Sequence, residues 1–168
     1  MTNPAPWLEE SQQSLWRRWI RVNALLPVAL HRELQADSRL SLPDFEVLVC
    51  LTENPDGRVR VSDLAHALNW ERSRLSHHVG RMERRGLVKR QGCPDDGRGA
   101  FVVLTPDGRA SIQQAAPGHV REVRRLLFDH LTGDEVTVLA GVLDKVLTRL
   151  EGAAAEQIQI DPPQEETA

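Results

Sequence analysis

The sequence predicts a mainly α-helical (α+β) fold, in which a winged helix-turn-helix lobe is carried between N- and C-terminal helices. Residues 58–105 follow the order short strand, short helix, turn, long basic helix and two β-type runs around a polar loop. Residues 7–36 and 105–151 have the apolar periodicity of long helices. The charge also divides by segment, since residues 57–110 hold 11 Lys/Arg and 6 Asp/Glu, a balance of +5, whereas the rest of the chain carries −8. A basic lobe on an acidic frame suits a polyanionic partner.

The length of 168 residues fits one domain of ordinary size. Within it we expect residues 41–104 to form the winged lobe and residues 6–36 and 105–151 to form the helices of a dimerisation region. Residues 1–5 and 152–168 carry little apolar surface and are expected to be disordered tails. No apolar run is long enough to cross a membrane and no signal-peptide core is present, so we expect a cytoplasmic protein.

The first helix has a continuous apolar stripe. Its members recur at steps of three or four and are Leu15, Trp19, Val22, Leu26 and Leu30. Residues 41–54 then begin like a second helix, with Ser41 and Asp44 three positions apart and Pro43 near the start. The apolar content of this second helix predicts burial behind the helix-turn-helix.

Residues 62–69 predict the first helix of the helix-turn-helix. Leu64 and Leu68 lie on one edge, Ser62 is placed to act as the N-cap, and Asn69 ends the pattern.

Residues 70–86 predict the second, recognition helix. Leu75, Val79 and Met82 share one face of it and therefore point to the core. The segment closes on Gly86, the residue type that most easily adopts the left-handed conformation after a helix.

The opposite face of residues 70–86 carries hydroxyl, imidazole and guanidinium donors and no carboxylate. These groups bind base edges and phosphates, and Gly80 removes a Cβ where a DNA strand could pass closely. The residues predicted to contact DNA here are Arg72, Ser73, Arg74, Ser76, His77, Arg81 and Arg84. A solvated basic face is the alternative interpretation, but the preceding short helix and the following loop favour a recognition helix.

Residues 92–100 predict the wing, because they are polar and rich in Gly and Pro and lie between the β-type runs 87–90 and 101–104. An arginine at such a tip can enter the minor groove, so we assign the groove contact to Arg98 and its orientation to Asp96. The alternative is an ordinary charged turn with an exposed ion pair.

Four short sequence motifs follow one another in a characteristic order. They are Val61-Ser62-Asp63-Leu64-Ala65, Arg72-Ser73-Arg74-Leu75-Ser76, Met82-Glu83-Arg84-Arg85-Gly86-Leu87-Val88, and Asp96-Gly97-Arg98-Gly99 followed by Val103-Leu104-Thr105-Pro106-Asp107-Gly108. Together they resemble the MarR (multiple antibiotic resistance regulator) family, over about residues 15–150. The resemblance implies a sequence-specific double-stranded DNA-binding transcriptional regulator, with a repressor as the expected mode.

The apolar stripes of the terminal helices find no cover in one small winged lobe, so a second copy is expected to cover them. The resemblance implies the same homodimer. Two-fold symmetry would place the two recognition helices, residues 70–86, roughly 34–36 Å apart on a near-palindromic operator.

The resemblance also implies a small aromatic effector that binds between the dimerisation region and the lobe. The candidate residues for it are Trp16, Trp19, Asn23, His31 and Phe45. Plain core packing is the alternative role for these side chains. A redox-responsive regulator acting through Cys93, near Arg90 and Arg98, is a further alternative.

An enzyme or a metal module is disfavoured by the pattern of potential ligands. His77 and His78 are adjacent and so point about 100° apart on a helix, and no paired-ligand spacing occurs. We therefore expect no catalytic residue, no cofactor and no metal. A winged helix used only as a protein-interaction module is also possible, but it would not need a carboxylate-free basic face.

Overall fold

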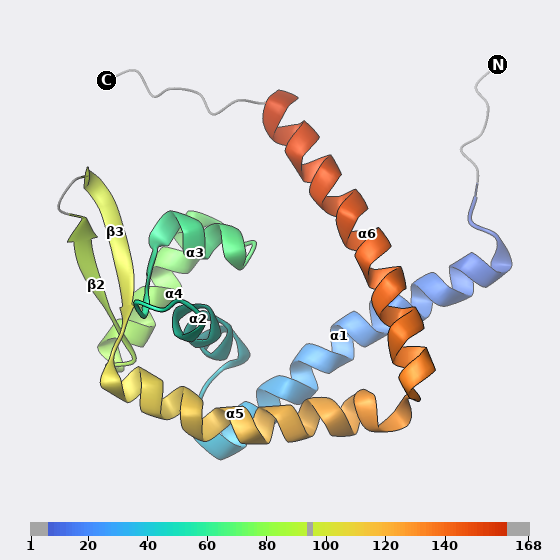
Figure 1. Ribbon diagram of the computed structural model, residues 1–168, viewed down its shortest axis with the longest axis horizontal. Coiled ribbons are helices and arrows are strands. Elements are labelled where there is room, and N and C mark those ends of the chain that lie inside the picture. The colour runs from blue at the N-terminus through green and yellow to red at the C-terminus, as the bar shows by residue number, and fades with distance from the viewer. Residues whose placement is uncertain (1–6, 94–95, 161–168) are drawn as a thin grey trace. The chain divides into compact units, whose positions relative to one another are not determined.

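The computed structural model describes residues 7–93 and 96–160, without side-chain positions for Cys93, 96–98 and 154–160. The elements in chain order (Figure 1) are α1 (Glu10–Ser38), α2 (Leu42–Glu53), β1 (Arg58–Arg60), α3 (Val61–Ala67), α4 (Arg72–Arg84), β2 (Val88–Cys93), β3 (Asp96–Leu104), α5 (Pro106–Leu126), the short 3-10 helix η1 (Phe128–His130) and α6 (Gly133–Ile160). This order confirms the predicted fold class. The chain divides into two compact units after Val123.

The second helix begins as predicted. Ser41 Oγ accepts from the backbone N–H of Asp44 at 3.1 Å, and the Asp44 carboxylate accepts from the backbone N–H of Ser41 at 2.9 Å. This reciprocal capping box satisfies two of the amides that a helix start leaves unpaired. It also fixes the Asp44 side chain, which reappears below.

The helix-turn-helix differs from the prediction at its helix starts. Arg60 is the N-cap of α3, and the hydroxyl of Ser62 donates to the Asp63 carboxylate, so the assignment of Ser62 as N-cap was wrong. The reason is that β1 runs directly into α3, so the helix starts at Val61, two residues earlier than a Ser62 N-cap would allow. Helix α4 is also shorter than 70–86, because Glu71 is its non-helical N-cap and Arg72 is the first helical residue.

Two left-handed residues set the turns that follow the two helices of the helix-turn-helix. Asn69 has φ 51° between α3 and α4, and Gly86 has φ 75° after α4. Positive φ is permitted to Gly and is tolerated by Asn better than by most other residues. The two turns therefore lie where the sequence predicted them.

The wing is part of a three-stranded antiparallel sheet with strand order β1-β3-β2. In the register of the sheet Val59 pairs with Val102, while Arg60 pairs with Phe101 and Gln91 also pairs with Phe101. Because side chains alternate along a strand, the valines share the core face and Arg60 shares the outer face with Phe101. The predicted strands 87–90 and 101–104 are thus the bases of a longer hairpin.

One apolar core unites the winged lobe with its flanks. Figure 1 shows α2, α3 and α4 grouped beside the β2–β3 hairpin. The largest fully buried side chains are Leu34, Leu40, Val47, Leu48, Leu51, Leu64, Leu75, Val79, Met82, Val88 and Val102. They come from α1, the connection between α1 and α2, α2, α3, α4 and the sheet. The inner face predicted for the recognition helix, Leu75, Val79 and Met82, is confirmed.

The joint between the wing and α5 explains why Thr105 and Gly108 follow β3. Thr105 Oγ1 donates toward the carbonyls of Gly86 and Leu87 and accepts from the N–H of Gly108. A Cβ on Gly108 would lie 2.0 Å from the Leu87 carbonyl oxygen, a distance that no side chain can occupy. Only glycine therefore fits at this crossing.

Residues 152–160 correct the predicted C-terminal tail. They continue α6 to Ile160, whereas we expected disorder from 152 onward. Their sequence contains Ala, Glu and Gln, which have high helix propensity and extend an existing helix at little cost. Residues 1–6 and 161–168 lie outside the described residues. Among the described helices none is long and apolar enough to cross a bilayer.

Candidate nucleic-acid interface

Helix α4 separates its residues cleanly into two faces. Leu75, His78, Val79 and Met82 are buried. The polar side chains predicted to touch DNA are all exposed: Arg72, Ser73, Arg74, Ser76, His77, Arg81 and Arg84. The one carboxylate within α4 belongs to Glu83, which is half-buried and accepts from the backbone N–H of Arg90 at 2.9 Å. The exposed face of α4 is therefore free of negative side chains.

A buried polar cluster fixes α4 to the start of α2. Asp44, which is 3% exposed, lies 2.6 Å from Nη1 of Arg85 and 3.0 Å from Nε2 of His78. The His78 contact is close but not aligned as a hydrogen bond. Arg85 also donates to the carbonyl of Arg39. His78, in the middle of α4, and Arg85, at its C-cap, are thus held against the same carboxylate of Asp44.

The ionisation of Asp44 follows from these contacts. Burial alone would raise the pKa of the carboxyl, but His78, the Ser41 backbone and hydroxyl, and Arg85 outweigh burial and hold the pKa well below its usual range. Asp44 is therefore ionised in the folded protein at any physiological pH. Its negative charge lies beneath the basic helix.

Two of the predicted DNA-contacting arginines are oriented by aromatic or imidazole neighbours. Nη2 of Arg81 lies 2.8 Å from Nδ1 of His78, and the guanidinium of Arg74 lies 4.5 Å from the centre of the Trp70 ring. A guanidinium can only donate, so Nδ1 of His78 accepts and the ring proton is on Nε2, facing Asp44. These contacts lower the freedom of two long side chains before any partner arrives.

A polar pocket joins α3, α4 and the wing. Its volume is about 410 Å³ and it is lined by Arg60, Val61, Ser62, Arg72, Ser76, Gly99 and Ala100. Two guanidinium groups and two hydroxyls are suited to an anionic oxygen such as a DNA phosphate. Sequence reasoning included Arg72 and Ser76 but missed Arg60 and Ser62. Alternation along β1 could have placed Arg60 on the outer face with Phe101, whose ring lies 5.3 Å from the Arg60 guanidinium.

The space at Gly80 also has a neighbour within the chain. A Cβ on Gly80 would lie 3.7 Å from Nη2 of Arg90, an ordinary contact distance, and the close passage of a DNA strand there stays a prediction. Arg90 reaches from β2 across α4 and donates to the carbonyl of Ser76. It thereby links the wing to the recognition helix, a role that sequence periodicity gave no means of finding.

The tip of the wing lies largely outside the described residues. This includes Pro94 and Asp95, and the side chains of Cys93, Asp96 and Arg98. The backbone of β2 and β3 forms the predicted hairpin, with an irregular register between Gly92 and Cys93. The minor-groove contact of Arg98, its orientation by Asp96 and a redox role for Cys93 stay predictions.

The candidate effector residues are not gathered in one place. Trp16, Trp19 and Asn23 are exposed on α1, and Nδ1 of His31 accepts from the backbone N–H of Leu42 at the start of α2. Phe45 alone lines a described pocket, which is formed by α1, α2, the end of α3 and α5.

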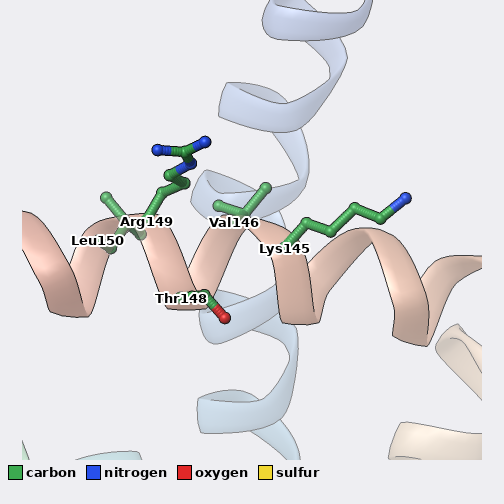
Figure 2. A pocket seen from close by; sticks show the side chains of 5 residues that line it. All are labelled: Lys145, Val146, Thr148, Arg149 and Leu150. Atoms are coloured by element: carbon green, nitrogen blue, oxygen red, sulfur yellow. The ribbon is translucent and has the colours of Figure 1, made fainter.

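A further pocket lies on α6 and has no enclosing wall. Figure 2 shows its five lining side chains, which all come from this one helix: Lys145, Val146, Thr148, Arg149 and Leu150. A site for a small ligand normally requires groups that converge from several elements. We therefore interpret this feature as an uncovered helix face.

Metal and thiol chemistry gain no support from the geometry. No group of three or more His, Cys, Asp or Glu suited to a metal ion occurs within the described residues. Burial, together with Glu53 and Glu46, raises the pKa of the Cys50 thiol and so lowers its reactivity.

Comparisons with known proteins converge on one family. The MarR family profile matches residues 40–99. AbsC from Streptomyces coelicolor, a MarR family transcriptional regulator, is 40% identical and covers 88% of this chain and 99% of its own, with a TM-score of 0.83. Sco3205 from the same organism, a MarR family transcriptional regulator solved in complex with DNA, is 35% identical and covers 98% and 97%, with a TM-score of 0.81.

A curated relative extends the agreement at lower coverage. The multiple antibiotic resistance protein MarR of Salmonella typhimurium is 32% identical over 91 residues, which are 54% of this chain. The match spans 63% of that protein, a little under two thirds of its length. AbsC and Sco3205 are both described as MarR family transcriptional regulators. The fold, the resemblance of the motifs and the near-complete match to AbsC agree that the chain belongs to the MarR family.

Proposed function

We propose that the chain is a sequence-specific, double-stranded DNA-binding transcriptional regulator. The observation that carries this proposal is the division of α4 into a buried apolar face and an exposed face of hydroxyl, imidazole and guanidinium groups. Such a helix suits the major groove, whose base edges accept from arginine and from small polar side chains. The wing, residues 92–100, would follow the adjacent minor groove.

Electrostatics supports DNA over a protein partner. The polar pocket at Arg60 and Arg72 offers a second point of phosphate contact beside α4. A protein-interaction module of the same fold would not need basic side chains that extend from α4 into this pocket. The DNA-bound relative Sco3205 is consistent with the same partner here.

We also propose that the regulator acts as a homodimer on a near-palindromic operator. Large apolar side chains on α1 and α6 are exposed, among them Leu15 at 66% and Leu150 at 62%. Exposed apolar surface on this scale marks an interaction site, and a second copy offers the same surface by symmetry. A dimer bound to a promoter in the cytoplasm would obstruct transcription, so repression is the proposed mode.

Selection of binding sites from genomic DNA, followed by fluorescence anisotropy at several salt concentrations, tests the proposal. Arg72→Ala should weaken binding and lower the slope of log affinity against log salt by about one, because one phosphate contact is lost. Arg32→Ala, on the exposed surface of α1, is the matched control and should leave the slope unchanged. Failure to enrich any sequence would refute the proposed function.

A further inference from the structure

His78 is the one polar side chain of α4 that is buried. It is 5% exposed and lies between the Asp44 carboxylate at the start of α2 and the exposed guanidinium of Arg81. The proposed function uses Arg81 as a DNA contact and leaves His78 without a role. One imidazole ring thus connects a buried charge to the surface that is to meet DNA.

Two contacts besides Arg81 fix the His78 ring in place. Nε2 lies 3.0 Å from a carboxylate oxygen of Asp44, and the His78 and Trp70 rings meet edge to face with centroids 5.3 Å apart. A side chain packed on several sides within a core is restricted to one rotamer. Nδ1 therefore points in a fixed direction, and Nη2 of Arg81 lies 2.8 Å from it.

The neighbours of His78 also determine which ring nitrogen carries the proton. The charge of Asp44 favours a proton on Nε2, the nitrogen that faces the carboxylate. The guanidinium of Arg81 can only donate, so it requires an unprotonated Nδ1. Both neighbours select the same neutral tautomer. A proton on Nδ1 would set an N–H against the guanidinium N–H and would displace Arg81.

The hydrogen bond to His78 orders Arg81 before a partner arrives. Ordering a long, mobile side chain at an interface weakens binding by roughly two- to tenfold. Arg81 is exposed, and Nδ1 of His78 reduces this cost by holding its guanidinium in advance. Arg84 is exposed on the same helix and has no hydrogen bond or ion pair among the described residues. The two arginines therefore differ in whether a buried group positions them.

We propose that His78 is a positioning residue for DNA binding. Nδ1 of His78 holds Arg81 in its DNA-contacting orientation, and Asp44 holds His78 in the tautomer that this requires. The inference rests on the proposed function, since Arg81 is to contact DNA. It gives a buried side chain, which touches no nucleotide, control over the affinity of the exposed face of α4.

Nitrogen-15 NMR of the imidazole tests the tautomer in the protein without DNA. His78 should show a protonated Nε2 and an unprotonated Nδ1. The Nδ1 resonance should shift in Arg81→Ala, because its hydrogen-bond donor is removed. Arg84→Ala is the matched control and should leave both resonances unchanged. A proton on Nδ1, or an Nδ1 resonance that does not move in Arg81→Ala, would overturn the proposal.

A double-mutant cycle measures whether His78 acts through Arg81. On a selected operator, His78→Leu should weaken binding by about three- to tenfold in the wild-type background and by less than about twofold in Arg81→Ala. The same substitution should keep its full effect in Arg84→Ala, since Arg84 does not touch the ring. A full effect in both backgrounds would show that His78 supports only the fold, and would contradict the proposal.

Two polar variants separate the acceptor from the packing of the ring. Asparagine places its amide oxygen near the position of Nδ1, whereas glutamine places its amide near the position of Nε2. His78→Asn should therefore bind the operator within about twofold of the wild type, and His78→Gln should lose about three- to tenfold. This contrast is measurable even where His78→Leu does not fold. Equal losses, or the reverse order, would refute the role of Nδ1.

The pattern of losses across single-base variants of the operator separates this inference from the proposed function. His78→Gln should weaken binding to the same variants as Arg81→Ala, by smaller factors. A wild type that selects an operator while the two patterns differ refutes the positioning role and leaves the regulator. A wild type that selects no DNA refutes the regulator and with it the role of His78 in DNA binding, whatever tautomer NMR shows.

Discussion

The winged lobe and the terminal helices use apolar residues in opposite ways. Within the described part of the chain every buried apolar residue lies between Leu34 and Ala115. Among the side chains whose positions are described, every large apolar one that is strongly exposed lies in residues 7–28 or 120–150. The two sets do not overlap along the sequence.

This difference teaches that helical periodicity and burial are separate kinds of information. The stripes of α1 and α6 are as regular as the inner face of α4, and all three segments are helical. Only α4 has its apolar face covered within the chain. A covered face gives the lobe its own stability, whereas an uncovered face requires a partner.

The largest effect is expected from charging the uncovered faces. Leu15→Glu combined with Leu150→Glu should give a folded monomer by light scattering, because two acidic groups would be buried in the proposed dimer interface. Operator affinity should fall by about 10² to 10⁴, since the two lobes would no longer bind as one unit. Gln35→Glu with Thr137→Glu adds the same charges to exposed polar positions of the same helices. A variant that stays dimeric would show that these faces are not the interface.

The covered region should respond most to loss of its buried carboxylate. Asp44→Asn removes the partner of Arg85 and His78 and should lower the free energy of unfolding by about 3–5 kcal/mol. Asp144→Asn, on the exposed surface of α6, should cost less than about 0.5 kcal/mol. Urea denaturation of both variants measures the contrast. Similar values would mean that the cluster contributes no more than a surface charge.

The same carboxylate predicts an acid dependence. The folded pKa of Asp44 is lowered, so the unfolded chain takes up a proton first as the pH falls. The stabilisation from Asp44 is complete above its unfolded pKa of about 3.9 and is lost as the pH falls from there toward the folded value. Unfolding curves between neutral and acid pH should therefore fall less steeply in Asp44→Asn. Parallel curves would contradict the assignment.

A glycine-to-alanine substitution should change the stability in opposite directions in the two regions. Gly108→Ala forces a Cβ onto the Leu87 carbonyl and should destabilise the protein by about 1–3 kcal/mol or more. Gly141→Ala, in α6, meets no atom within 4 Å and should stabilise by up to about 1 kcal/mol, because alanine favours a helix. Thermal unfolding distinguishes the two. A stabilising Gly108→Ala would show that the α5 joint can relax.

The sequence predicted what depends on neighbours along the chain. The capping box at Ser41 and the turns at Asn69 and Gly86 follow from local backbone chemistry, and the inner face of α4 follows from periodicity. The family motifs led to the winged helix-turn-helix and to the exposed basic face.

The sequence did not predict what depends on contacts across the fold. Arg90 reaches Ser76 from 14 residues away, and Asp44 meets Arg85 across 41 positions. Neither sequence separation follows from the period of a helix or a strand, so periodicity alone could not reveal these contacts. The same limit applies to the pocket beside Phe45, where Glu46 and His119 come from different helices.

Within the lobe, the base-reading role proposed for α4 predicts a change of sequence preference more than a change of stability. His77→Ala should cost about 1–3 kcal/mol at particular base pairs of the operator and little elsewhere. Its side chain is exposed, so the free energy of unfolding should hardly change. Competition among single-base variants of the operator measures the preference. A uniform loss at all positions would place His77 on the phosphates.

The smallest change in DNA affinity is expected from a substitution in the wing. The salt dependence of binding distinguishes this change from the others. Arg98→Ala should weaken binding to all sequences alike and reduce the salt slope by about one, because a cation near the minor groove is lost. Lys145→Ala removes a charge from α6 and should leave the slope unchanged, since α6 belongs to the proposed dimer region and not to the DNA surface. Asp96→Ala should reproduce part of the Arg98 effect if the carboxylate orients the guanidinium. An unchanged slope in Arg98→Ala would remove the wing from the DNA interface and leave α4 as its principal element.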